Sequence, residues 1–177
     1  MVTIGETLPT QRRHGLPDPW GVAAATPDPE LPMVTIGELG ILRSVEAGVD
    51  GVVATITPTY SGCPALREIA ADLRRRLESA GYPHVEVRTQ LAPAWTTDWI
   101  SEAGARSLRE AGIAPPRPAP RSSGPTLLRL SPTRGAVACP RCGSTDTVRT
   151  AQFGSTACKA LHRCATCAEP FEYLKEI

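Results

Sequence analysis

Two Cys-x-x-Cys motifs in the last third of the sequence constrain the fold more than any other feature. Cys139 and Cys142 form the first motif, Cys164 and Cys167 form the second, and 21 residues separate them. At this separation four thiolates come within reach of one tetrahedral ion. The pattern predicts a zinc ribbon over residues 135–177, with a structural metal because thiolates fill all four coordination positions. Rubredoxin-type iron fits the same ligands, so the metal stays open.

A second constraint is the turn formed by residues 57–64. The apolar run Val52–Ile56 before it predicts a buried strand, and apolar residues recur at helical spacing after it. Pro64 suits the first helical position, which places Cys63 at or beside the N-cap. Because the helix dipole and free N–H groups stabilise an anion there, we expect a lowered pKa for the Cys63 thiol. The alternative is a small buried side chain that fills the turn.

The remaining periodicity divides the chain into four parts. Strands are expected over residues 39–45, 52–57 and 85–91, and helices over 64–80 and 100–111. This order predicts an α+β chain in which residues 28–116 form a small α/β domain with a mixed three-stranded sheet covered by helices. Residues 1–27 show no periodicity and predict a mobile tail, and the Pro-, Arg- and Ser-rich residues 117–134 predict a linker.

Charge and composition exclude several classes of protein. The net charge is only +1, although residues 1–116 hold 10 Lys and Arg against 14 Asp and Glu, and residues 117–177 hold 9 against 4. The basic C-terminal part permits a nucleic-acid-binding ribbon, but aromatic residues are sparse there and no long basic run exists, so no nucleic-acid partner is expected. The sequence shows neither a membrane-spanning apolar run nor a signal peptide, which predicts a cytoplasmic protein with no membrane partner.

The sixth cysteine, Cys158, has no evident partner inside the ribbon. The basic residues Lys159 and Arg163 lie close in sequence and favour its thiolate form. Cys158 is therefore either a small buried residue of a ribbon loop or a second iron ligand that meets Cys63 across the two domains.

Two further segments carry alternatives. Asp28 and Glu30, in an Asp-Pro-Glu turn, either cap that turn or bring carboxylates near Cys63. Trp95 and Trp99 lie within five residues of each other, and they either cover a core edge or form the wall of a site.

Several of these segments resemble a known family. Residues 28–30, 39–41 and 57–65 are similar to the SufT-like family of iron–sulfur assembly factors. Residues 93–100 and 112–116, together with the Phe-Gly-Ser-Thr-x-Cys-Lys-Ala segment at 153–160, narrow the resemblance to the PaaD family of phenylacetate degradation. The resemblance covers about residues 28–116 and 135–177, and the extension through residue 27 departs from it.

The resemblance implies an accessory protein and not an enzyme. Such proteins help to mature iron or iron–sulfur centres, and the client here is the multicomponent phenylacetyl-CoA epoxidase, through its oxygenase or reductase component. The reactive cysteine of the family maps onto Cys63 and the acidic loop onto Asp28 and Glu30, with Thr59 shaping the site. The expected cargo is a transient iron ion or cluster, handled by Cys63 and, on the second interpretation above, by Cys158.

Two alternatives to this interpretation stay open. The first is a non-catalytic structural subunit of the epoxidase, in which Cys63 is buried and inert. The second concerns assembly: two cysteines are few for a cluster, so a homodimer that pools Cys63 from two chains is an option. An independent oxygenase is not expected, because the sequence has only three histidines and no Glu-x-x-His pair for a di-iron site.

Overall fold

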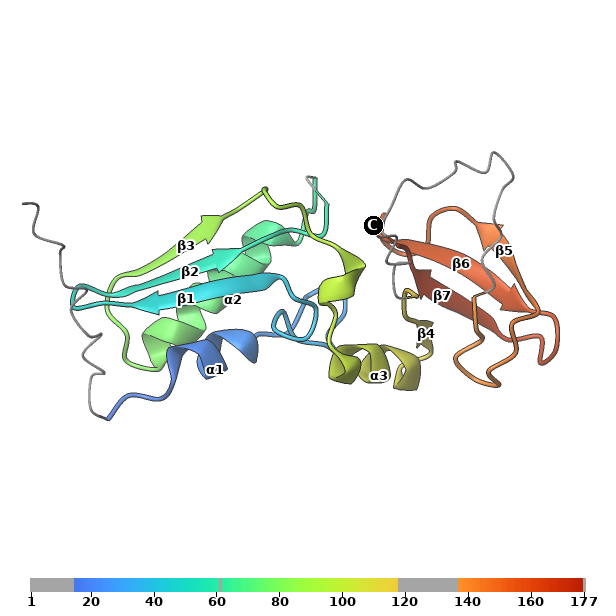
Figure 1. The fold of residues 1–177 in the computed structure, drawn as a ribbon, viewed down its shortest axis with the longest axis horizontal. Helices are drawn as coiled ribbons and strands as arrows, with labels where there is room; N and C mark the ends of the chain where they lie inside the picture. Colours follow the sequence, from blue (N-terminus) through green and yellow to red (C-terminus); the bar gives the residue numbers. More distant parts are fainter. Residues whose placement is uncertain (1–14, 61, 118–136, 177) are drawn as a thin grey trace, which may run out of the picture.

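A computed structural model describes residues 15–60, 62–117 and 137–176, and shows two sheets that follow one another along the long axis of the molecule (Figure 1). The first sheet has the order β1-β2-β3, with strands Leu42–Ala47, Val52–Ile56 and Val85–Thr89. β1 runs antiparallel to β2, and β2 runs parallel to β3. The mixed three-stranded sheet and the α+β class are thus confirmed, although β1 begins three residues later than predicted.

The main helix, α2 (Leu66–Ser79), packs on this sheet because its apolar residues fall on one face. Ile69, Leu73 and Leu77 are at most 2% exposed and join the buried residues of β2 in one core. Arg75 and Arg76 lie on the outer face and pair with Asp72 at 3.1 and 2.8 Å, so the arginine run is a solvated surface.

Two short helical elements complete the domain. The 3-10 turn η1 (Thr97–Trp99) and the helix α3 (Glu102–Glu110) follow β3, close to the predicted helix over 100–111. Ser101 begins α3 as its N-cap, and its hydroxyl accepts the N–H of Gly104 at 3.0 Å.

The expected mobile tail over residues 1–27 needs a correction. Residues 19–24 form a helix, α1 (Pro19–Ala24), which contacts α2 and β1 (Figure 1). The carboxylate of Asp18 accepts the Gly21 N–H at 2.8 Å and caps this helix, and Ala23 is fully buried. Six residues are too few for a helical period to show in the sequence. Residues 1–14 lie outside the described part.

The second sheet belongs to the C-terminal domain but includes a strand of the first domain. β5 (Thr147–Ala151), β6 (Lys159–Cys164) and β7 (Pro170–Leu174) are antiparallel, as expected for a ribbon. β4 (Ile113–Ala114) pairs in parallel with β7 and extends the sheet. The predicted boundary near residue 116 therefore follows directly on a strand that the two domains share.

An ion pair lies close to this junction. The guanidinium of Arg117 donates to the carboxylate of Glu176 at 2.9 Å, two residues beyond the end of β7. Most of the predicted linker, residues 118–134, lies outside the described residues. Within the part of the chain that the structure describes, no helix has the length and apolar character needed to cross a membrane.

Candidate functional site

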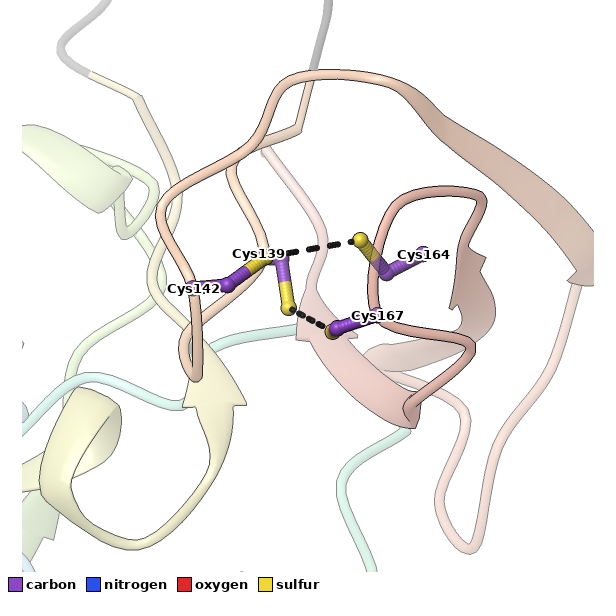
Figure 2. Close-up of side chains that lie close together, drawn as sticks. All are labelled: Cys139, Cys142, Cys164 and Cys167. Carbon is purple, nitrogen blue, oxygen red and sulfur yellow. Dashed lines mark hydrogen bonds between the residues drawn. The ribbon is translucent and has the colours of Figure 1, made fainter.

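The four ribbon cysteines converge on one point. Figure 2 shows Cys139 and Cys142 facing Cys164 and Cys167, with sulfur–sulfur distances of 3.8 Å between Cys139 and Cys167 and 3.6 Å between Cys142 and Cys164. All four sulfurs lie within 4.8 Å of one another. Four thiols at these separations fit the tetrahedral S4 set of a structural zinc site, with no position left for a substrate.

Among the ribbon thiols, Cys164 and Cys142 have pKa values shifted in opposite directions, with that of Cys142 raised to about 12 by contacts with the other thiols, against a backbone hydrogen bond at Ser144 that lowers it. The pKa of the Cys164 thiol is lowered to about 6, chiefly because the N–H of Cys167, with help from Thr166, points at its sulfur. Gly143 turns the first motif with φ of 75°, a conformation that favours glycine, and donates its N–H to the Cys139 carbonyl at 2.9 Å. Local backbone hydrogen bonds thus shape the first motif and the surroundings of Cys164.

A second group of candidate side chains lies at the junction of the two domains. A cavity of about 20 Å³ is lined by all five remaining candidates from the sequence, together with Trp95 from the first domain and Leu174 from β7. The five candidates are Asp28, Glu30, Thr59, Cys63 and Cys158. We call this cavity the interdomain pocket.

Cys63 reaches the interdomain pocket from the turn between β2 and α2. Its N–H donates to the Tyr60 carbonyl at 3.1 Å, and its own carbonyl accepts the N–H of Leu66 at 3.4 Å. The helix begins later than predicted, at Leu66 with Ala65 as N-cap, so Cys63 lies two residues before the cap.

The predicted low pKa of Cys63 is therefore wrong. Burial raises the pKa of this thiol, and the nearby carboxylates of Glu30 and Asp28 raise it further, against one backbone hydrogen bond at Ala65 that lowers it. The helix begins beyond Cys63, and Cys158 and Leu174 of the ribbon cover the turn, so burial outweighs the helix terminus. Cys63 thus holds its proton at neutral pH.

Cys158 enters the interdomain pocket from the ribbon, just before β6. Its carbonyl accepts the N–H of Lys175 at 2.9 Å, and its sulfur lies 3.0 Å from the hydroxyl of Thr156. Burial raises the pKa of this thiol as well. The expected support from Lys159 is small, because the Lys159 ammonium is itself buried and paired with Glu172 at 2.9 Å.

The Asp-Pro-Glu turn fulfils both of its alternatives. One oxygen of Asp28 accepts the N–H groups of Glu30 at 2.8 Å and Leu31 at 2.9 Å, so the carboxylate caps the turn. The same residue lines the interdomain pocket together with Glu30. Burial raises the pKa of both carboxyls, and for Glu30 the charge of Asp28 adds to the effect.

Trp95 and Trp99 have different surroundings, and only Trp95 lines the interdomain pocket. Trp95 is buried, donates its indole N–H to the Leu39 carbonyl at 2.9 Å, and forms part of the pocket wall. Trp99 lies under the guanidinium of Arg43, which stands 3.5 Å from the ring centroid. Leu174 is a wall residue that sequence reasoning missed, since nothing local indicates that a ribbon strand covers the first domain.

Comparison with known proteins assigns a family to each domain. Residues 25–88 match the family described as iron-sulfur cluster assembly protein, and residues 123–175 match the PaaD zinc beta ribbon domain. The C-terminal domain is accordingly a zinc ribbon, as predicted.

Two curated relatives extend the comparison. The chain is 44% identical over 156 residues to a protein of Escherichia coli strain K12 that is named as a subunit of 1,2-phenylacetyl-CoA epoxidase, with 88% of this chain and 90% of the relative covered. It is 39% identical over 77 residues to an Fe-S protein maturation auxiliary factor of Porphyromonas gingivalis, with 42% and 72% covered. A crystal structure of a DUF59 domain from Bacillus anthracis matches at 29% identity and a TM-score of 0.48, covering 51% of this chain and 87% of that one.

The raised pKa of Cys63 predicts slow alkylation near neutral pH. In the zinc-loaded protein we expect iodoacetamide to modify Cys63 more slowly at pH 7–8 than in the same chain unfolded in urea. Because only the thiolate reacts, the rate rises with pH, and the midpoint in the folded chain lies above that in the unfolded chain. Peptide mass spectrometry across a pH series measures both midpoints. A folded midpoint at or below the unfolded one contradicts the burial argument.

The shared sheet predicts that the ribbon metal also protects the interdomain pocket. Cys142→Ala removes one of four ligands, so we expect loss of the bound metal and unfolding of the ribbon. Because Cys158 and Leu174 then leave the pocket, Cys63 alkylates faster than in the native chain. Metal analysis and amide hydrogen exchange measure whether the ribbon keeps its metal and its fold.

Cys63→Ala is the matched cysteine variant, and we expect it to keep both the metal and the fold. Unchanged Cys63 reactivity in Cys142→Ala would show that the two sites are independent.

Proposed function

Since the chain belongs to the PaaD family, which includes the Escherichia coli relative named as a 1,2-phenylacetyl-CoA epoxidase subunit, we propose that it matures an iron or iron–sulfur centre of that multicomponent epoxidase. The observation that carries the proposal is the convergence of Cys63 and Cys158, from different domains, in one small pocket beside Asp28 and Glu30. In this account the chain is an accessory protein and does not catalyse the epoxidation.

The chemistry of the pocket side chains supports iron handling. Thiolates are soft ligands that bind iron, and carboxylates are harder ligands that complete its coordination. Burial raises the pKa of both thiols and both carboxyls of the interdomain pocket, so negative charge there is unfavourable without a nearby cation. An incoming cation compensates this charge and displaces the two thiol protons, and the thiols take up protons again when the cation leaves.

The two cysteine sites suit different roles, one for a resident metal and one for a transient metal. The ribbon offers a closed set of four thiols, which suits a resident zinc ion that stabilises a domain with a small core. The interdomain pocket offers two thiols, which suits a metal that must leave again. Free thiols of this kind persist in a reducing compartment, which supports a cytoplasmic site of action.

The Escherichia coli relative is named as a subunit of an epoxidase, which suggests the other epoxidase subunits as partners of this chain. We propose that the oxygenase or reductase component docks on this chain to receive its metal. Three large apolar side chains of the ribbon, Val148, Phe153 and Leu161, are exposed and available for such contacts.

One observation favours a second function, that of a structural subunit. The raised pKa values of Cys63 and Cys158 make both thiols unreactive, as expected if their only role is to pack in the core. In that case the chain binds the epoxidase at fixed stoichiometry and handles no metal.

Client maturation separates the two functions. The epoxidase subunits are produced together with the native chain, Cys63→Ser or Leu91→Ala, the last an exposed control on the loop after β3. We expect the iron content and activity of the purified epoxidase to fall about tenfold or more with Cys63→Ser, because the serine oxygen is a poor iron ligand. Leu91→Ala leaves both unchanged.

Thermal unfolding and zinc content are measured on the Cys63→Ser chain to check that it is folded. Full epoxidase iron and activity with this variant, together with stable co-purification at fixed stoichiometry, would contradict the maturation function and establish the structural one.

A further inference from the structure

We propose that the interdomain pocket carries a single ferrous ion and not an assembled iron–sulfur cluster. The inference rests on the proposed function and names its cargo. It starts from three properties of the pocket: its volume, the rigidity of its walls and its number of thiols.

The volume of the pocket admits one small occupant. Its free space is about 20 Å³, and a cavity of about 10–15 Å³ is the minimum for one water molecule. The smallest cluster core contains two iron and two sulfide ions, so it needs several times this space. A single ion fits in this space once the ligand side chains turn toward it.

The ribbon wall of the pocket is held from several sides. The Cys158 carbonyl accepts the Lys175 N–H at 2.9 Å, which ties the two ends of the wall together. The next residue, Lys159, is 4% exposed, and its ammonium binds Glu172 of β7 at 2.9 Å. Because β7 is paired with β4 of the first domain, widening the pocket requires the junction to open.

The number of thiols also limits the cargo. Biological clusters are held by four cysteine ligands or by a comparable set, and the pocket offers only Cys63 and Cys158. Two thiolates with oxygen donors from Asp28 and Glu30 match the coordination needs of one divalent ion with affinity for sulfur. A single ion also needs no cysteine from a second chain, so the homodimer is not required.

The ligands of the interdomain pocket lie further apart than those of the ribbon, which suits release of the bound ion. The four ribbon sulfurs already lie within 4.8 Å of one another, and among the residues that the structure describes no other group of three or more His, Cys, Asp or Glu side chains meets that limit. The pocket ligands must therefore move inward around the ion, which lowers the affinity relative to a preformed site. Binding is not a redox step: Fe²⁺ forms two bonds to sulfur, and the two thiol protons leave to solvent.

Anaerobic equilibrium dialysis of the zinc-loaded full chain against Fe²⁺ tests this inference. We expect saturation at one iron per chain, with the dissociation constant raised about tenfold or more in Cys63→Ser and in Cys158→Ser. Glu30→Gln weakens binding by a smaller factor, and Glu86→Gln, an exposed carboxylate on β3, is the matched control with no effect. Because two protons are displaced, the affinity rises by up to about 100-fold per pH unit below the thiol pKa values.

The same samples are then incubated with excess iron and sulfide. One iron and no acid-labile sulfide per chain supports the single-ion cargo. Two or more irons with matching sulfide would overturn it, as would native affinity in Cys158→Ser. The cargo and the proposed function can fail independently of each other. A cluster on this chain with a client that still depends on Cys63 refutes only the cargo, whereas full client maturation by Cys63→Ser refutes the proposed function itself.

Discussion

The pairing of β4 with β7 is the interaction on which the rest of this molecule depends. Through two residues of parallel pairing, Ile113 opposite Glu172 and Ala114 opposite Tyr173, it fixes the ribbon against the α/β domain. This placement brings Cys158 over the turn that holds Cys63. We therefore expect the ribbon metal to maintain the second site as well, although none of its four cysteine ligands lines that pocket.

Different surroundings set the pKa of Cys164 in the ribbon and of Cys63 in the interdomain pocket. In the ribbon, backbone N–H groups point at Cys164 and lower its pKa to about 6, so this thiol is ready for a permanent ion. In the interdomain pocket, burial and neighbouring carboxylates raise the pKa of Cys63. A protonated thiol resists oxidation and binds a cation only in exchange for its proton. On the proposed function, one chain combines a site that retains metal with a site that exchanges it.

Features set by local spacing were predictable from the sequence. The four ribbon ligands and the main helix follow from fixed intervals, and the ribbon and the mixed sheet are confirmed. The pocket candidates were named from their motifs, and the structure gathers them in one cavity. Features set by distant contacts were not predictable. The direction of the Cys63 pKa depends on cover by another domain, α1 is shorter than two helical turns, and a two-residue strand such as β4 has no pattern of its own.

The central claim is that one chain holds a resident metal in the ribbon and a different, exchangeable metal at Cys63. Metal analysis of the native chain and Cys63→Ala, both isolated anaerobically from iron-replete cells, tests it most directly. The account predicts one zinc per chain in both proteins, and substoichiometric to equimolar iron only in the native chain. Zinc alone in both proteins, even after incubation with iron, would contradict the account and leave Cys63 as a buried structural residue.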